Sequence, residues 1–365
     1  MNFRDNDIIF LLGAGASADA GIPVSKQMVD EIEDSIDGDW QKYKDLYYLI
    51  KSGVQYSAGL SGKSVNFNIE ILLFVLEELM QKESHLLYPF IGSWNVKFNE
   101  VVKDDFNLIQ DFHNDIKQKL NGWVTPRDYR KADYFKHLKK LKDELTFPLR
   151  VFTLNYDKCI EENRSRPGFE FSVERGFEEE ETNRLWNYKR FDEVTPDSEA
   201  DVYLYKLHGS IDWERDDETK VVSCIDGAPS EPDLIFGTQN KLQFADPYLY
   251  LFSSFRFHTL KAKLIICIGY SFSDEHINGL ISQALKQDQN SKALVIKYDN
   301  EEKSDILEVL KVHARQIVVK QSSAKDYFEN ELTTENLMAI FPIDKTEDDE
   351  ILQFKKYDHT TIDMT

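Results

Sequence analysis

An amide and an imidazole follow two apolar runs of strand length: Asn155 in "LRVFTLNYD" and His208 in "VYLYKLHGS". The Asn155 amide can hold a water molecule or a sugar hydroxyl by hydrogen bonds without adding charge. A free imidazole titrates near pH ~6.5 and can accept a proton near neutral pH, and the Asp157 carboxylate can orient a hydroxyl or steady a positive charge. Each group also has an ordinary structural explanation. Asn155 and Asp157 suit the start of a helix from Lys158, and a lone histidine is often only packed or exposed.

A glycine-rich elbow, Gly13-Ala14-Gly15, ends the first apolar run, "DIIFLL". Glycine permits a tight turn and close approach of the backbone, and we expect a helix to start near Ser17. Backbone N–H groups and the helix dipole would then face an anion, so the elbow predicts a phosphate site formed by Gly13, Ala14, Gly15 and Ser17. A tight turn that binds nothing is the alternative. The acidic residue expected ~20 positions later cannot be used, because the segment that follows is helical.

Two further strand-like runs also end in small or polar residues. "CIGYSFSD" places Gly269 and Ser271 after one run, and Asp299 follows "LVIKY". Ser273 or Asp274 suits the N-cap of the helix that follows. Because ligands of open α/β sheets bind beyond the carboxyl ends of the strands, we expect these groups to line one crevice.

The elements that must position these residues form an α/β pattern. Most of the strand-like runs are nearly continuous in apolar residues, which is typical of parallel strands buried on both faces. Helical patterns over 274–286 and 301–313 make the closing half β-α-β-α-β, which predicts a Rossmann-like, doubly wound parallel sheet. The strand-like runs are 7–12, 149–155, 202–209, 263–271, 292–299 and 315–320.

Between 24 and 147 there is no convincing strand pattern, only helical candidates at 69–80, 101–120 and 129–145. The helix over 69–80 is apolar on two sides, which is typical of burial between neighbours, although Phe74 and Val75 could instead form a subunit contact. The charged segment 176–201 predicts a loop or a small excursion. A solvated tail is the simpler interpretation of the acidic C-terminus, and a docking peptide is the alternative. We therefore predict a discontinuous Rossmann domain, a helical insertion and an acidic tail, over 1–23 with 148–341, 24–147 and 342–365 respectively.

Composition limits the function further. The net charge is −21, with 65 acidic against 44 basic residues, which disfavours a general nucleic-acid surface. The three cysteines form no CxxC pair, which excludes a disulfide framework and a four-thiolate zinc site. No apolar run approaches the ~20 residues of a membrane span, and the N-terminus lacks the pattern of a signal peptide. We expect a soluble, cytoplasmic protein.

The motifs "GAGAS", "AGIP", "TLNYD", "LHGS" and "GYSFSD", in this order, resemble the sirtuin-type NAD-binding domain. More narrowly, they resemble the sirtuin-like (Sir2-type) NADases of bacterial antiphage defence. The resemblance covers residues 7–23 and 149–320. Two departures count against a protein deacylase: the paired cysteines of a zinc module are missing, and Gly21-Ile22-Pro23 runs into Val24-Ser25-Lys26 instead of the GIP-x-F-R pattern.

The resemblance implies a role for each candidate residue, with NAD+ as substrate and no metal. Asn155 and His208 would be the catalytic pair, and Asp157 would lie at the ribose. The pyrophosphate would lie on Gly13, Ala14, Gly15 and Ser17, the adenosine on Gly269 and Ser271, and the adenine ribose near Asp299.

The function implied is an NAD+ glycohydrolase that cleaves NAD+ to nicotinamide and ADP-ribose and acts in antiphage defence by depleting NAD. The resemblance also implies control by homo-oligomerisation and a partner such as a HerA-type hexameric ATPase. A non-catalytic module that binds NAD or ADP-ribose and an NAD-dependent deacylase are the alternatives. NADP and other nucleotides stay open as substrates.

Overall fold

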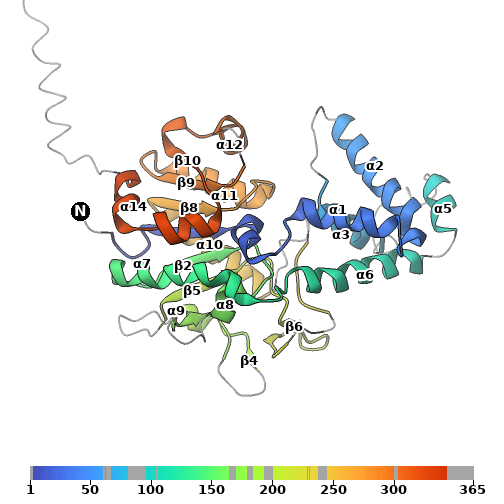
Figure 1. The fold of residues 1–365 in the computed structure, drawn as a ribbon, viewed down its shortest axis with the longest axis horizontal. Helices are drawn as coiled ribbons and strands as arrows, with labels where there is room; N and C mark the ends of the chain where they lie inside the picture. The colour runs from blue at the N-terminus through green and yellow to red at the C-terminus, as the bar shows by residue number, and fades with distance from the viewer. Residues whose placement is uncertain are drawn as a thin grey trace, which may run out of the picture.

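The computed structural model shows a sheet domain with a helical lobe beside it (Figure 1). The residues that the structure describes are 3–60, 62, 67–80, 96–103, 106–163, 170–178, 184–192, 200–227, 229, 231–236, 245–299 and 303–342. From residue 343 onward, the acidic tail predicted from the sequence lies outside the described residues.

A seven-stranded parallel sheet forms the centre of the molecule, with strand order β10-β9-β8-β1-β2-β5-β3. All of the strand-like runs predicted from the sequence are strands of this sheet, and the predicted α/β fold is confirmed. From β1 the chain builds the sheet through β2 and β5 on one side, and it later returns to β8 on the other side. The strand order therefore reverses between β1 and β8. The strands are β1 (Ile8–Leu12), β2 (Leu149–Thr153), β3 (Val173–Glu174), β5 (Val202–Lys206), β8 (Leu264–Ile268), β9 (Lys292–Lys297) and β10 (Ile317–Gln321).

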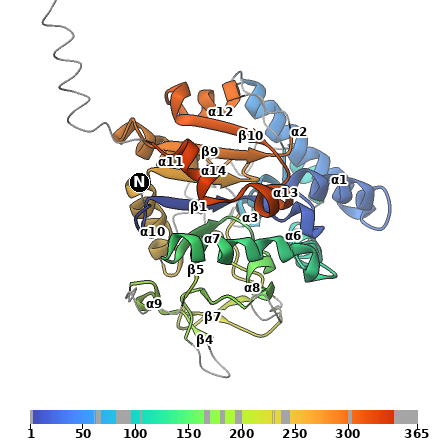
Figure 2. The same ribbon diagram turned by 60° about the vertical axis from the view of Figure 1, so that its left-hand side comes forward.

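Both faces of the sheet are buried, because side chains alternate along each strand. In β1, Ile8, Phe10 and Leu12 pack into one core, whereas Ile9 and Leu11 pack into the core of the opposite face. Figure 2 shows helices of the first face in front of the sheet. The first face is covered by η4 (Tyr129–Lys136), α7 (His137–Leu145), α8 (Cys159–Asn163), α13 (Ala324–Asp326) and α14 (Thr334–Ile340), and the second by α10 (Tyr248–Lys261), α11 (Glu275–Gln287) and α12 (Lys303–Leu310).

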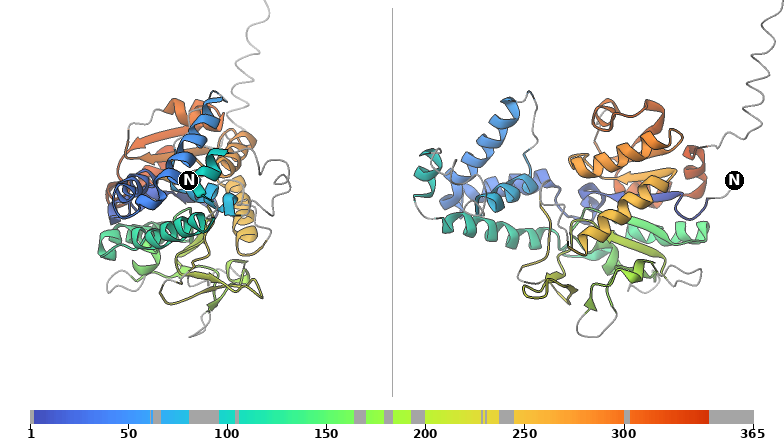
Figure 3. Two further views of the ribbon diagram at one scale, coloured as in Figure 1. Left: turned by 90° about the vertical axis from the view of Figure 1, so that its right-hand side faces the viewer. Right: turned by 180° about the vertical axis from the view of Figure 1, so that it is seen from behind.

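The helical lobe lies to one side of the sheet domain, as the view from behind also shows (Figure 3). Its described residues contain no strand. The helix predicted over 69–80 forms with these bounds, the one over 101–120 divides into two, and the one over 129–145 is a 3-10 segment followed by α7 on the sheet. The lobe consists of α1 (Ser25–Ile36), η3 (Gln41–Tyr43), α2 (Lys44–Leu60), α3 (Ile69–Met80), α5 (Val96–Val102) and α6 (Asn107–Trp123).

A small antiparallel sheet, in the order β4-β7-β6, was not predicted from the sequence. Its strands are β4 (Arg184–Leu185), β6 (Trp213–Arg215) and β7 (Val222–Cys224). The segment 176–201, predicted as a loop or a small excursion, contains β4 and helix α9 (Lys189–Asp192). Strands of two or three residues are too short to show an alternating pattern.

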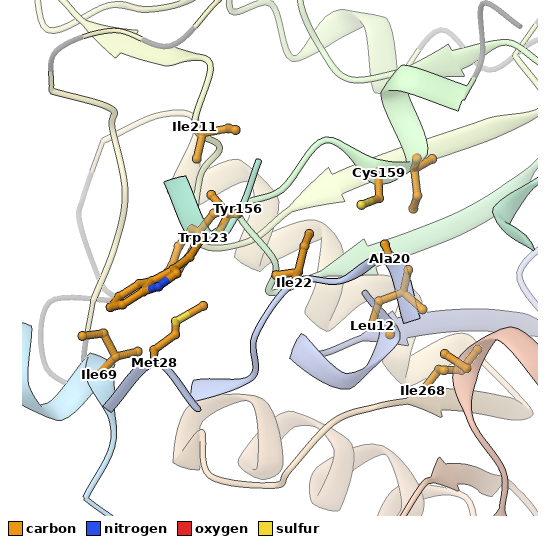
Figure 4. Packing of buried hydrophobic residues seen from close by; sticks show 14 of the residues in the cluster. Leu12, Ala20, Ile22, Met28, Ile69, Trp123, Tyr156, Cys159, Ile211 and Ile268 are labelled. Atoms are coloured by element: carbon orange, nitrogen blue, oxygen red, sulfur yellow. The ribbon is translucent and has the colours of Figure 1, made fainter. Parts of the chain in front are cut away.

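The lobe and the carboxyl edge of the sheet share one hydrophobic core. Figure 4 shows Met28, Ile69 and Trp123 of the lobe gathered on the side of Ile22 and Tyr156. Tyr156 stands directly after Asn155, so the lobe packs on the loop that carries one of the candidate catalytic residues.

Candidate functional site

Asn155 and His208 follow neighbouring parallel strands at the same level. Thr153 of β2 pairs with Lys206 of β5. Asn155 lies two residues after Thr153, and His208 lies two residues after Lys206. The ladder continues past the strands, because Leu207 N donates to Thr153 O at 2.9 Å. The sheet therefore brings the two loops together at its carboxyl edge.

The elbow after β1 differs from the prediction, because no α-helix starts near Ser17. Two short 3-10 turns follow instead, η1 (Ala14–Ala16) and η2 (Ala18–Ala20), and α1 begins only at Ser25. Since the macrodipole needs aligned peptides over a real helix, the expected dipole at the elbow is missing. The helix dipole was one reason to assign the pyrophosphate to Gly13, Ala14, Gly15 and Ser17, and that reason was wrong.

The elbow glycines pack against the end of β8. Gly13 N donates to Ile268 O at 3.0 Å, and Gly15 N donates to Gly269 O at 3.0 Å. A Cβ at Gly13 would lie 2.6 Å from Gly269 O, and one at Gly15 would lie 2.8 Å from Gly269 Cα. Gly269 itself has a φ of 63°, a left-handed conformation that favours glycine. These glycines therefore let two backbones meet where the strand order reverses, and two of the elbow amides are already used.

Asn155 ties its loop to the elbow. Its Nδ2 atom donates to Gly13 O at 2.9 Å and to Ser17 Oγ at 3.1 Å. Because a carbonyl oxygen can only accept, the orientation of this amide is fixed. Both Nδ2 hydrogens are occupied, and no described residue donates to Oδ1. The Oδ1 atom is therefore the group that can accept a hydrogen bond from a water or a hydroxyl.

Asp157 contacts the start of a helix, which the sequence analysis gave as the alternative to a ligand-binding role. Its Oδ1 accepts from Cys159 N at 2.9 Å, at the start of α8, and the residue is buried. This is an N-terminal helix contact.

His208 is a buried histidine whose hydrogen-bonding capacity is unused. The residue is 1% exposed, and neither ring nitrogen has a hydrogen-bond partner among the described residues. Its Nε2 lies 3.3 Å from Asp274 Oδ2, which is an ion-pair distance without hydrogen-bond geometry. The Tyr156 ring lies 6.4 Å away, and the His208 carbonyl accepts from Ile235 N at 3.0 Å. A buried polar group left unpaired calls for an explanation, and a catalytic role is one.

A buried lysine that the sequence analysis missed joins the two loops. Lys206, two residues before His208, donates to Asp157 O and lies 3.0 Å from Glu161 Oε1. Tyr156 O also accepts from Ile211 N at 3.2 Å. A lysine at the end of the apolar strand "VYLYK" was the available signal, because a lysine is almost never fully buried unless it is paired.

This lysine belongs to a buried network of alternating charges. Arg175 donates to both carboxylate oxygens of Asp212 at 2.9 and 3.0 Å, and its Nε lies 3.5 Å from Glu161 Oε1. Burial alone would raise the pKa of Asp212, but Arg175, Lys206 and Lys158 outweigh it and hold the pKa well below its ordinary value. Burial alone would lower the pKa of Arg175, but the carboxylates of Asp212 and Glu161 outweigh it and raise the pKa above its ordinary value. Both members of the pair are therefore charged.

A second missed residue supports the elbow from outside the sheet. Tyr134 of η4 donates its hydroxyl to Ala16 O at 2.6 Å, and its ring is buried. In the same segment, Ala132 O accepts from Asn163 Nδ2 at 2.9 Å, which connects η4 to α8. The segment after the helical lobe thus contacts both the elbow and the helix that follows Asp157.

The remaining predicted residues extend along the same edge of the sheet. Ser271 is exposed, and its Oγ lies 2.9 Å from Ser273 Oγ. Asp299 is exposed beyond β9. Two strands, β8 and β1, separate β9 from β2. Asp299 therefore lies in the row of strand ends but not beside Asn155, whereas Ser271 belongs to the loop after β8 that reaches His208 through Asp274.

Within the described ranges, no group of three or more His, Cys, Asp or Glu side chains could hold a metal ion. None of the helices that the structure describes is long and apolar enough to cross a membrane. The three cysteines, Cys159, Cys224 and Cys267, are buried and unpaired.

Comparison with known proteins gave a family match over part of the chain and several structural matches. Residues 149–315 match the model of the SIR2-like domain. A Sir2 homologue in complex with NAD is similar in structure, with 14% identity, a TM-score of 0.43, and coverage of 91% of this chain and 90% of the other. A mutant Sir2 homologue with 2′-O-acetyl ADP ribose (13% identity, TM-score 0.42, 91% and 92% covered) and Sir2Tm with a propionylated peptide (11%, 0.36, 88% and 90%) are also similar. No curated protein matches the sequence significantly. Residues 149–315 thus match a SIR2-like domain, and they belong to an α/β fold built on a parallel sheet.

Proposed function

We propose that this protein is an NAD+ glycohydrolase, which uses water to cleave NAD+ into nicotinamide and ADP-ribose. The SIR2-like domain supports an NAD-binding, sirtuin-type function in general. Cleavage is supported by one observation: Asn155, with its open Oδ1, and His208, a buried histidine with two unpartnered ring nitrogens, follow neighbouring strands at the same level. Binding alone does not require a base at this place.

The chemistry follows from the bond that breaks. Nicotinamide leaves as a neutral molecule because the bonding electrons neutralise its cationic ring, and the ribose passes through an oxocarbenium-like state. Asn155 would position the water or a ribose hydroxyl through Oδ1, since its Nδ2 is held by the elbow. His208 would accept the proton that the attacking water releases.

Hydrolysis is favoured over deacylation by the cysteines. The chain has only three, and all are buried and unpaired, so they do not supply the paired cysteines of a zinc module. Hydrolysis of NAD+ also requires no channel for an acylated peptide.

The test is incubation of the purified full chain with NAD+ alone while nicotinamide release is followed by chromatography. We expect release without peptide from the wild type and at least about a hundredfold less from His208→Ala, in line with the loss of a general base. Asn155→Ala should abolish release, whereas its matched control Asn114→Ala, at an exposed position on α6 in the helical lobe, should keep full activity. Release that occurs only with an acyl-lysine peptide would show a deacylase instead.

A second candidate is a non-catalytic module that binds NAD or ADP-ribose. The burial of His208 favours it, because an imidazole that is 1% exposed is shielded from substrate in this conformation. Binding of NAD+ by calorimetry without any release of nicotinamide, by the chain alone and with its cellular partners, would support this candidate over hydrolysis.

We further propose that the activity serves antiphage defence by depleting NAD, under control of homo-oligomerisation or of a HerA-type hexameric ATPase. The candidate contact is α3, where Phe74 is half-buried and Val75 packs against the first core. Phe74→Glu should lower the mass measured by light scattering while circular dichroism stays unchanged. An unchanged mass in this variant would rule out this contact.

A further inference from the structure

The structure assigns to Asp274 a positioning role: its carboxylate holds the His208 imidazole in the orientation that leaves Nδ1 as the proton acceptor. This inference rests on the proposed function for its catalytic consequence, and on the geometry alone for the contact. Asp274 follows β8 in "GYSFSDEH", a segment whose candidate ligand residues are Gly269 and Ser271.

The two oxygens of Asp274 do different things. Oδ1 accepts from His276 N at 3.0 Å and from Ile277 N at 3.3 Å, so it caps helix α11. Oδ2 points to the other side and lies 3.3 Å from His208 Nε2. Both residues are buried, at 4% and 1% exposed. A carboxylate at this distance in a poorly solvated place stabilises an N–H directed at it.

The carboxylate is held in place by its surroundings. Tyr270 donates its hydroxyl to Asn278 Oδ1 at 2.8 Å and lies within 3.2 Å of Asp274 O. Asn278 Nδ2 in turn donates to Phe272 O at 2.7 Å. This network anchors the backbone at the first turn of α11, and the Asp274 side chain could turn away from His208 only by breaking its own bonds from His276 N and Ile277 N.

The contact decides which nitrogen of His208 is available. Because a carboxylate only accepts, the tautomer that it favours carries the proton on Nε2 and leaves Nδ1 as the basic nitrogen, which has no partner among the described residues. In the reaction, a water oxygen forms the bond to the anomeric carbon and its proton passes to Nδ1 of His208. The bond to nicotinamide breaks, and its electron pair goes to the nicotinamide nitrogen. The charge that His208 gains is then balanced by Asp274. In this structure the contact is 3.3 Å long and lacks hydrogen-bond geometry, but such contacts often tighten only when substrate is bound.

Capping by itself would explain Asp274 without any link to the site, so the experiment must separate the two roles. Asn is as good an N-cap as Asp, so Asp274→Asn keeps the cap and removes the charge. Thr333→Ala is the matched control, because Thr333 caps α14 through Asn336 N at 3.2 Å and lies outside the proposed machinery. It should lower the melting temperature and leave the rate of NAD+ cleavage unchanged.

Two readouts are compared between wild type and Asp274→Asn. In steady-state kinetics we expect kcat of Asp274→Asn to fall at least about tenfold, with KM nearly unchanged. The melting temperature of this variant should equal that of the wild type. In NMR spectra of the imidazole groups, the His208 signals are identified among the 8 histidines by their loss in His208→Gln. We expect a downfield N–H signal of His208 in the wild type that moves upfield in Asp274→Asn.

The outcomes separate this inference from the proposed function. If the wild type releases no nicotinamide, the hydrolase proposal fails, and the NMR comparison still decides whether Asp274 orients His208. An Asp274→Asn variant with wild-type kcat and unchanged His208 signals would overturn the inference while leaving the hydrolase in place. A loss of kcat that is matched by the Thr333→Ala control would also overturn it, because a general loss of stability would then explain the effect.

Discussion

Replacement of Gly15 by alanine tests whether the elbow and the end of β8 must touch. A Cβ at this position would lie 2.8 Å from Gly269 Cα and 3.1 Å from Gly269 O. Both are backbone atoms, so no flexible side chain can move aside. Gly269 is itself constrained by its φ of 63°. The two backbones must therefore separate by a few tenths of an ångström.

The size of the effect follows from two contributions. Overpacking of a tight contact costs about 1–3 kcal/mol, and the strained hydrogen bond from Gly15 N to Gly269 O adds about 1 kcal/mol. The sum of about 2–4 kcal/mol is below the stability of typical proteins, about 5–15 kcal/mol, so Gly15→Ala should still fold. The elbow also holds Asn155 through Gly13 O, so the variant should lose NAD+ binding as well.

Urea denaturation and NAD+ titration measure the two effects, with Gly53→Ala as the matched control. Gly53 lies exposed within α2, and a Cβ added there would meet no atom within 4 Å, so alanine at this position should stabilise by about 0.5–1 kcal/mol. The change from glycine to alanine should thus lower the free energy of unfolding at position 15 and raise it at position 53. A Gly15→Ala protein with wild-type stability and wild-type NAD+ binding would refute the close contact of the two loops.

Three further predictions concern the strand-end loops. Asn155→Asp should bind NAD+ more weakly than Asn155→Ala in calorimetry, because a carboxylate would face Gly13 O where the amide now donates at 2.9 Å. Lys206→Met should lower the free energy of unfolding by about 3 kcal/mol in urea, because it removes the nearer of the two cations of buried Glu161 and leaves only Arg175 at 3.5 Å; Lys97→Met, in an exposed pair, should change it little. The depressed pKa of Asp212 contributes stability that is complete above its ordinary value of 3.8 and is lost as pH falls through its lower folded value. Acid unfolding followed by fluorescence should therefore be less steep below this pH in Asp212→Asn.

Apart from the two-residue strand β3, the positions of the parallel strands and of helix α3 could be read from the sequence. Each is set by a local pattern, since a continuous apolar run suits a strand buried on both faces and helical spacing suits 69–80. Helix α10 was missed because its apolar side chains surround it: Leu251 and Phe255 are buried, whereas Leu249 and Phe257 are about half exposed. A helix without one apolar stripe has no helical signature.

The candidate site was predictable only as a set of strand ends. The alternation of strands and helices determined that Asn155, His208 and the elbow follow parallel strands, and the carboxyl ends of such strands meet at one edge. The sequence could not show that the elbow glycines pack on Gly269 or that Asp274 faces His208.

These contacts join residues far apart in the chain, and they depend on strand order, register and the packing of whole loops. Local composition therefore determined the kinds of elements and the chemical groups at their ends. Only the tertiary structure decided which groups meet, because a contact of about 3 Å is set by the position of the entire backbone and not by any one segment.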